Sequence, residues 1–481
     1  MAGWLRTETL MMRGNLNVRR KRYQEALECY YEVTQLRPDY ATAFAQLGYC
    51  LAAVGRHRDA LDAYERALQI RPDFTDVFPY LSLTLEHLGD MRIASEYLER
   101  AFRNSPRLKN QTDAAYWHHQ LGLMYGKLGE WTRSADHLRS AVAGKPEESG
   151  YCNLAISLWH TGDSQGCIEA YTRATSLAPN SAEGYGGLGW AYYNLGRYTE
   201  AVGPLRRAVE IDGTDADARY HLGMVLGETG QPEEALQVLN EAAKLRPGHA
   251  DTRYAIGVTL ASQGIFAKAI EAYHEAVKLR PDYADAYFNI GVAYSELGQP
   301  EEEIGAYKMA VNFNDEDTGA WGNLALSYSQ KLMHKEALEA YAKLCELQPD
   351  NEMGYYGAAT SLAHLERFEE AVLNFQQAIR HAPSFIAAHE YLGWTYSIMG
   401  KFSDALACYA TAMSLAPNSA QLHSELADIY EQMGNEEGAL QLRSKAVEFQ
   451  RSGADPALPI PKRPITRIAV DNSLSESNWL N

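Results

Sequence analysis

The residues best suited to chemistry are a run of glycines in the middle of the chain. Residues 184–189, Gly-Tyr-Gly-Gly-Leu-Gly, match the GxGxxG pattern with which a dinucleotide-binding turn holds a pyrophosphate. That chemistry requires a strand before the glycines and a βαβ unit around them, and the surrounding sequence shows neither pattern. We therefore interpret the run as part of a helix, and we expect its additional glycines to leave open space beside it.

Two other groups of polar residues invite a metal-site interpretation. His118 and His119 form an adjacent pair, but neighbouring residues on a helix point to different faces, so they do not suit one shared ion. Asp315, Glu316 and Asp317 lack the spacing of a twelve-residue calcium loop, which favours a solvated turn. We find no GxxxxGK[ST], HExxH or GxSxG motif in the sequence. The expectation is a protein that is not an enzyme and that uses no cofactor and no metal.

The composition limits the kinds of partner that the protein can bind and the cellular compartment in which we expect it. The 62 acidic residues against 44 basic ones give a net charge of −18, which argues against nucleic acid because phosphate binding relies on a basic surface. No apolar run is long enough to cross a bilayer, and the first residues offer no apolar signal core. The six cysteines lack ligand spacing, and we read Cys50 and Cys167 as small core residues in a reducing compartment. The prediction is a cytoplasmic protein without membrane insertion.

These residues must be positioned by a unit that repeats along the chain and is clearest at residues 250–283. It holds two amphipathic helical patterns joined by a turn at Gly264, and Pro281 ends the second because proline cannot continue a helix. Thirteen such units start at residues 7, 41, 75, 115, 148, 182, 216, 250, 284, 318, 352, 386 and 420. Position 8 is glycine in eight units, and positions 20 and 27 are mostly alanine, so we expect paired helices to cross closely there.

The period and its small-residue positions resemble the tetratricopeptide repeat (TPR) family. The resemblance implies an all-α fold, a right-handed superhelical α-solenoid of tandem helix-turn-helix units. We expect the solenoid to occupy residues 1–450, with a six-residue insertion at 109–114 placed in a loop, and a Pro-rich tail to occupy 451–481. Pro204 falls inside a second helix, where we expect a kink or local break.

In TPR proteins, positions 2, 5, 6, 9, 12 and 13 of the first helix face a concave groove. Aromatic side chains at such positions provide large contact area with little entropy to lose, as in binding hot spots. Amides at position 6 are similar to the asparagine ladder in the TPR arm of O-linked N-acetylglucosamine transferases, although Gly187, Ala255 and Tyr391 interrupt it here. The candidate partner-binding residues are Trp159, Trp190, Tyr193, Tyr220, Tyr254, Phe288, Asn289, Asn323 and Trp394.

The resemblance implies a non-catalytic scaffold that binds an extended peptide or a partner helix in the groove. Asp and Glu at position 2 of four successive units favour a basic or amphipathic partner, unless they serve only the helix N-termini. Two alternatives stay open. One is a substrate-recruiting partner of a glycosyltransferase system. This alternative needs a separate catalytic chain, because too few residues follow the repeats for a catalytic domain. The other is a self-assembling scaffold regulated by its tail, so that a homo-oligomer is open as well.

Overall fold

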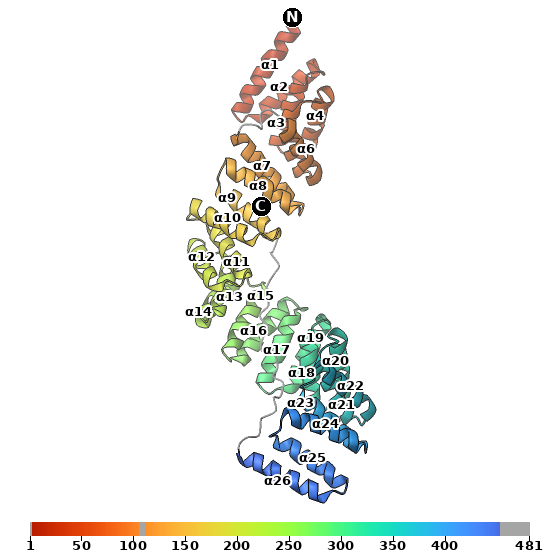
Figure 1. The fold of residues 1–481 in the computed structure, drawn as a ribbon. Helices are drawn as coiled ribbons and strands as arrows, with labels where there is room; N and C mark the ends of the chain where they lie inside the picture. The colour runs from red at the N-terminus through yellow and green to blue at the C-terminus, as the bar shows by residue number, and fades with distance from the viewer. Residues whose placement is uncertain (1, 105–110, 453–481) are drawn as a thin grey trace. The chain divides into compact units, whose positions relative to one another are not determined.

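The computed structural model describes residues 2–104 and 111–452, which form helices joined by short turns (Figure 1). The predicted all-α solenoid architecture is confirmed, because within each of the two compact units of this part of the chain consecutive helices pair as antiparallel hairpins, and no strand occurs among the described residues. The first helices of the hairpins are α1 (Ala2–Arg19), α3 (Ala41–Ala53), α5 (Phe78–His87), α7 (Gln111–Lys127), α9 (Glu148–His160), α11 (Ala182–Asn194), α13 (Ala216–Glu228), α15 (Ala250–Ser262), α17 (Ala284–Glu296), α19 (Thr318–Gln330), α21 (Glu352–His364), α23 (Ile386–Ile398) and α25 (Ala420–Gln432). The second helices are α2 (Tyr23–Leu36), α4 (His57–Ile70), α6 (Met91–Asn104), α8 (Trp131–Gly144), α10 (Ser164–Leu177), α12 (Tyr198–Ile211), α14 (Pro232–Leu245), α16 (Phe266–Leu279), α18 (Pro300–Phe313), α20 (His334–Leu347), α22 (Phe368–His381), α24 (Phe402–Leu415) and α26 (Glu436–Ser452).

The described helices fall into two compact units. One extends to Thr229 and the other begins at Gly230, so the division lies between α13 and α14. Within each unit every helix packs mainly against the helices before and after it in the chain. This nearest-neighbour packing is the property that makes a solenoid, because each hairpin buries its apolar face only against adjacent hairpins.

The turn inside the hairpin depends on a left-handed residue. Gly264 has φ +74°, and the open space around it shows that conformation rather than crowding selects glycine there. At the other end of the unit, the amide of Arg280 donates to the carbonyl of Ala276 and ends α16 immediately before Pro281. The predicted turn and the predicted helix end are therefore both confirmed.

The close crossing within a hairpin is made by glycine at position 8 and a large side chain at position 24. A Cβ on Gly257 would lie 2.5 Å from the ring of Tyr273, and one on Gly189 would lie 2.4 Å from Cγ of Leu205. Both distances are too short for a carbon contact, so only glycine lets the two helices approach in this way. The small residues of the repeat therefore have the packing role that the sequence predicts.

The segment around the predicted insertion differs from the expectation. α7 begins at Gln111, so residues 111–114 extend a helix instead of lying in a loop, whereas Lys109 and Asn110 lie outside the described residues. The third unit also departs from the frame, because a short 3₁₀ helix, η1 (Thr75–Val77), precedes α5. At the other end, α26 continues to Ser452, and the predicted tail beyond it lies outside the described residues.

The local break expected at Pro204 does not occur. α12 continues as one α-helix from Tyr198 to Ile211, with Pro204 in its interior. Proline has no N–H to donate to the carbonyl of Glu200, four residues earlier, so α12 tolerates the loss of one backbone hydrogen bond. Ala201, Leu205 and Ala208 on the same helix are buried, and this packing holds α12 together through the proline.

Candidate functional site

The glycine-rich run belongs to a helix, as the repeat frame predicts. All six residues lie in α11. The open space expected beside the additional glycines is filled by a neighbouring side chain at Gly187, whereas a Cβ on Gly186 would meet only Ala208, at 4.0 Å. A Cβ on Gly187 would lie 2.3 Å from Cε1 of Tyr171, which projects from α10 of the preceding hairpin. The run is therefore a packing surface for Tyr171 and does not form a phosphate-binding turn.

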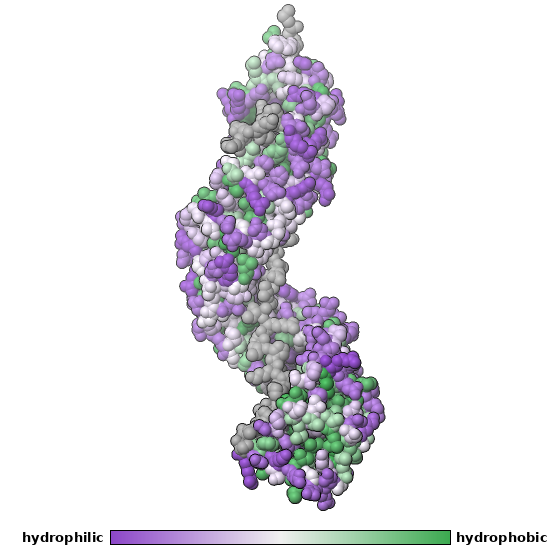
Figure 2. All heavy atoms as spheres, viewed as in Figure 1, coloured by the Kyte–Doolittle hydropathy of each residue, from purple (hydrophilic) through white to green (hydrophobic). Residues whose placement is uncertain are grey.

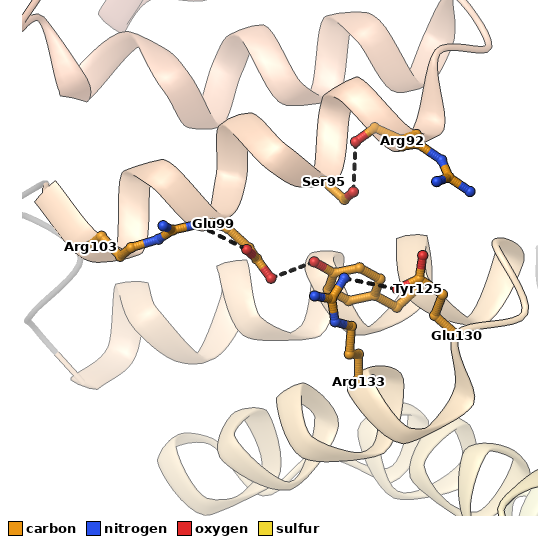
Figure 3. Close-up of polar contacts among 7 residues, drawn as sticks. All are labelled: Arg92, Ser95, Glu99, Arg103, Tyr125, Glu130 and Arg133. Carbon is orange, nitrogen blue, oxygen red and sulfur yellow. Dashed lines mark hydrogen bonds and ion pairs between the residues drawn. The ribbon is translucent and has the colours of Figure 1, made fainter.

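Titratable side chains outside the repeat pattern form one polar network between α6, α7 and α8. Glu99 accepts a hydrogen bond from the Tyr125 hydroxyl and an ion pair from Arg103 (Figure 3). Arg133 pairs with Glu130 at 2.9 Å, and its guanidinium lies 5.2 Å from the centre of the Tyr125 ring. Burial opposes ionisation of Glu99, yet the Tyr125 hydroxyl and Arg133 hold the pKa of its carboxyl below the usual value. The network joins α6 to the following hairpin and is a structural clamp.

The two adjacent histidines face different partners. His118 Nδ1 lies 2.9 Å from His137 Nδ1, and its ring stacks on Phe102 with 4.0 Å between ring centres. His119 instead lies within hydrogen-bond distance of Asn153, on α9. Across the described residues, no group of three or more histidine, cysteine, aspartate and glutamate side chains is arranged to hold a metal ion.

The strongest part of the predicted aromatic surface is a tryptophan pair on consecutive first helices. Trp159 of α9 and Trp190 of α11 meet edge to face, with 4.7 Å between ring centres and 66° between ring planes. Both are only partly buried, and both rest on the core formed by α8 to α11. They present aromatic surface on a rigid support, which is the arrangement typical of an interaction hot spot.

The other candidates on the first unit are buried. Tyr193 lies with its ring 5.8 Å from that of His221, and Tyr220 lies 5.1 Å from the same imidazole. Both tyrosine side chains are largely shielded from solvent by α11 and α13 packing together. In the described chain, Tyr193 and Tyr220 fix the position of neighbouring helices and expose little surface of their own.

The predicted amide ladder forms hydrogen bonds within the chain. Asn289 is 1% exposed, and its Nδ2 donates to the hydroxyl of Tyr254 at 2.8 Å. Asn323 is likewise buried, and its Nδ2 donates to the hydroxyl of Tyr307 at 3.3 Å. Phe288 is fully buried and packs beside Tyr307. Asn289 and Asn323 couple successive hairpins and Phe288 packs within its own, so the structure assigns all three a packing role that position in the repeat does not reveal.

One of the acidic residues at position 2 also has an internal role. Asp251 accepts a hydrogen bond from the Tyr283 hydroxyl at 2.8 Å and pairs with Arg280 at 2.6 Å. It therefore ties α15 to the loop that follows α16. This pairing favours the structural interpretation of Asp251 over direct contact with a basic partner.

The last candidate, Trp394, is exposed together with residues that the sequence analysis did not select. Its ring lies 6.3 Å from Tyr391, and Ile398 follows one turn later on the same face of α23. Glu390, beside Tyr391, is buried against Glu425 of α25. The repeat frame could have found this group, because residues 390, 391 and 398 are positions 5, 6 and 13 of their unit.

A second aromatic row was missed near the N-terminus. Tyr49, Tyr80 and Trp117 lie on α3, α5 and α7 and meet edge to face, with ring centres 5.5 Å and 5.9 Å apart. Tyr80 and the neighbouring Tyr116 are exposed. The three rings occupy positions 9, 6 and 3 of successive units, so no single repeat position marks the row.

The fold and the packing of its interior define a repeat protein made of α-helical hairpins, in which a glycine of the first helix meets a large side chain of the second. The sequence matches tetratricopeptide repeat family models at residues 6–73, 152–216, 220–277, 284–317, 318–351 and 392–457, and a TPR repeat model at 260–298. Together these matches span more than half of the chain. The protein belongs to the tetratricopeptide repeat family, and the models that match it are all repeat models and not catalytic families.

Comparison with known proteins adds solved structures of repeat proteins. MamA protein is 30% identical over 35% of this chain and 92% of its own, with a TM-score of 0.33. YrrB, described as a TPR protein with an unusual peptide-binding site, is 26% identical over 38% of this chain and 95% of its own, with a TM-score of 0.34. Yeast Tom70 is 16% identical over 94% of this chain and 98% of its own, with a TM-score of 0.34. No curated protein matches the sequence.

None of the described helices is both long and apolar enough to cross a bilayer.

Proposed function

We propose that the protein is a non-catalytic interaction scaffold that binds an extended peptide or a helix of a partner protein. The observation that carries the proposal is the pair formed by Trp159 and Trp190. Two large aromatic rings, partly open to solvent, lie together on the first helices of adjacent hairpins. A partner that covers this exposed aromatic surface gains favourable contact free energy, while the two rings lose little side-chain entropy.

The support beneath the pair is rigid enough for recognition. Ala155, Cys167 and Ala174 are completely buried in the core on which the two tryptophans rest. Tyr171 of the same core packs into the notch at Gly187 of α11. A partner therefore meets rings whose positions are already set by packing, so that less ordering is needed on binding.

The glycosyltransferase-recruiting alternative depended on amides free to hold a peptide backbone. Asn289 and Asn323 form their hydrogen bonds with tyrosines of the same chain. No other described feature favours that alternative, and the proposal is limited to protein or peptide binding.

The proposal is tested by placing a photo-crosslinking amino acid at residue 159 and, as a control, at residue 93. Ile93 is an exposed apolar residue of α6, a second helix of the same unit. Irradiation in extract of the source cells should attach a defined protein to position 159 and not to position 93. The same products at both positions, or no product at position 159, would contradict the proposal.

A further inference from the structure

The second unit carries an exposed aromatic face on α23. Tyr391, Trp394 and Ile398 are spaced by three and four residues, so they share one side of the helix. Their side chains are 36%, 37% and 49% exposed, which is high for large apolar groups in adjacent positions. On the side seen in Figure 2, hydrophobic residues gather over the segment labelled α21 to α24 in Figure 1.

Carboxyl groups lie at the edge of this face, where α23 meets α25. Glu390 precedes Tyr391 and is 4% exposed. The side-chain amide of Gln421 donates through its Nε2 atom to Oε1 of Glu390 at 2.6 Å and to Oε1 of Glu425 at 3.0 Å. The hydroxyl of Tyr409 donates to the second oxygen of Glu425 at 3.0 Å. Two carboxyl groups from successive first helices are therefore held around one amide.

The chain does not neutralise this pair with a cation of its own. Among the described residues, no lysine or arginine forms an ion pair with Glu390 or Glu425, and the basic side chain of this region, Arg443, pairs with Asp428 and Glu431. Burial raises the pKa of the Glu390 carboxyl to about 8, and the charge of Glu425 contributes in the same direction. Near neutral pH the pair therefore retains a proton that a neighbouring positive charge would displace.

We propose that the face formed by Tyr391, Trp394 and Ile398 docks a basic amphipathic segment of a partner protein. Apolar side chains of the segment cover the aromatic face, and a lysine or arginine lies beside the partly exposed Glu425, which shares the amide of Gln421 with the buried Glu390. Charge complementarity selects this occupant, because an acidic segment would bring more negative charge to a pair that has no cation. The exposed rings also attract a cation through their π faces. This inference rests on the proposed function and names the partner chemistry for the second unit.

Docking of a cation is linked to loss of the shared proton. Other titratable or charged groups around the pair could also contribute to a pH dependence. They are Tyr356 on α21, Tyr391 on α23, Tyr409 on α24, Asp428 on α25, and Arg443 on α26, which pairs with Asp428. Burial raises the pKa of each of these tyrosines above its ordinary value, so they stay neutral near pH 7. The proton of the Glu390–Glu425 pair is therefore the one that binding releases, and affinity should rise with pH up to about pH 8.

The test uses the full chain and two fluorescein-labelled synthetic peptides that place leucines on one helical face. One carries lysines on the opposite face and the other carries glutamates. Fluorescence anisotropy should show binding of the Leu/Lys peptide and not of the Leu/Glu peptide. Affinity for the Leu/Lys peptide should rise by up to about tenfold per pH unit between pH 6 and 8, the limit for release of one proton.

Two variants and a control locate the binding. The Y391A/W394A variant should bind the Leu/Lys peptide with an affinity lower by about tenfold or more, as expected for hot-spot residues. E390Q/E425Q should weaken it and remove the rise with pH. L373A removes an apolar side chain of α22 that is more exposed still, at 61%, and should leave affinity unchanged. Circular dichroism should show the same helix content for all variants.

The inference is overturned if both peptides bind alike, if Y391A/W394A binds as the wild type does, or if the pH dependence survives in E390Q/E425Q. Concentration-dependent light scattering that disappears in Y391A/W394A would identify a second copy of the chain as the occupant and would also overturn it. If these binding experiments fail while crosslinking at residue 159 still succeeds, the inference is wrong and the proposed function is retained. Failure of the inference can therefore be distinguished from failure of the proposed function.

Discussion

The ring of Tyr171 occupies the place of the side chain that Gly187 lacks. A Cβ on Gly187 would lie 2.3 Å from Cε1 of that ring, and the two residues belong to successive hairpins. The same relationship occurs between Tyr341 and Gly357, where the shortest distance is 2.2 Å. Contacts between hairpins therefore use position 6 of one unit and position 24 of the unit before it.

Replacing Gly187 with alanine should destabilise the protein by about 1–3 kcal/mol, because the methyl group forces Tyr171 out of its place. Gly186, the preceding residue of the same helix, provides a matched control. A Cβ there meets only Ala208, at 4.0 Å, so G186A should be neutral or stabilising by about 0.5–1 kcal/mol. Thermal unfolding followed by circular dichroism compares the two. Equal effects of G187A and G186A would show that the close approach of Tyr171 has no energetic weight.

Replacing Pro204 with alanine should stabilise α12, because the new N–H can donate to the carbonyl of Glu200. A proline inside a helix costs about 3 kcal/mol, so a gain of about 1–3 kcal/mol is expected. Hydrogen exchange of the α12 amides measures this locally, and exchange should slow across residues 200–208. Unchanged exchange would mean that packing of the buried face already supplies all the stability of α12.

The contact between His118 and His137 predicts that the first unit loses stability in acid. Burial, and to a smaller extent His137, lowers the pKa of His118 to about 4. The folded chain therefore binds a proton here less readily than the unfolded chain, whose histidines titrate near pH 6.5. Stability is fully present above pH 6.5 and decreases as the pH falls from there towards 4.

A His118→Asn variant should lose less of its melting temperature than the wild type when the pH is lowered from 7 to 5. His274 lies exposed on α16 of the other unit, and H274N serves as the control. The account is contradicted if H118N and H274N respond to pH alike.

The carboxyl pair Glu390–Glu425 predicts that the stability of the second unit depends on pH with the opposite sign. The pKa of Glu390 is raised to about 8, so the folded chain holds a proton that the unfolded chain releases near pH 4.5. The contribution of this group to stability is therefore fully present below pH 4.5 and is lost as the pH rises to 8. Glu390→Gln should raise the melting temperature at pH 8 and flatten its fall between pH 5 and 8. E271Q, at an exposed glutamate of α16, should leave that pH dependence unchanged.

The repeat frame made the hairpins predictable because its signals are local. Glycine at position 8, alanine at positions 20 and 27, and a terminal proline each constrain one crossing or one helix end, so they could be read without the structure. At Pro204 the local rule favoured a break that does not occur, because packing decides there: Leu205 and Ala208 are completely buried and hold α12 continuous.

The candidate surface was less predictable because position on a helix does not reveal what covers a side chain. Tyr254 and Asn289 both occupy groove positions in the frame, yet they bond to each other and are buried. Trp159 and Trp190 occupy positions 12 and 9, which are also groove positions in the frame, and they stay partly open. Tyr254 is covered by Tyr283, the last residue of its own unit, whose ring lies tilted against it with 4.9 Å between ring centres.

The most direct test of the central claim compares the proteins that co-purify with the wild type, with W159A/W190A and with I93A. We predict that quantitative mass spectrometry will find a defined set of proteins retained by the wild type and by I93A, and depleted about tenfold or more by W159A/W190A. The variants must show equal helix content, so that the loss reports the surface and not the fold. Identical sets from the wild type and W159A/W190A would contradict the claim that these two tryptophans form the partner-binding surface.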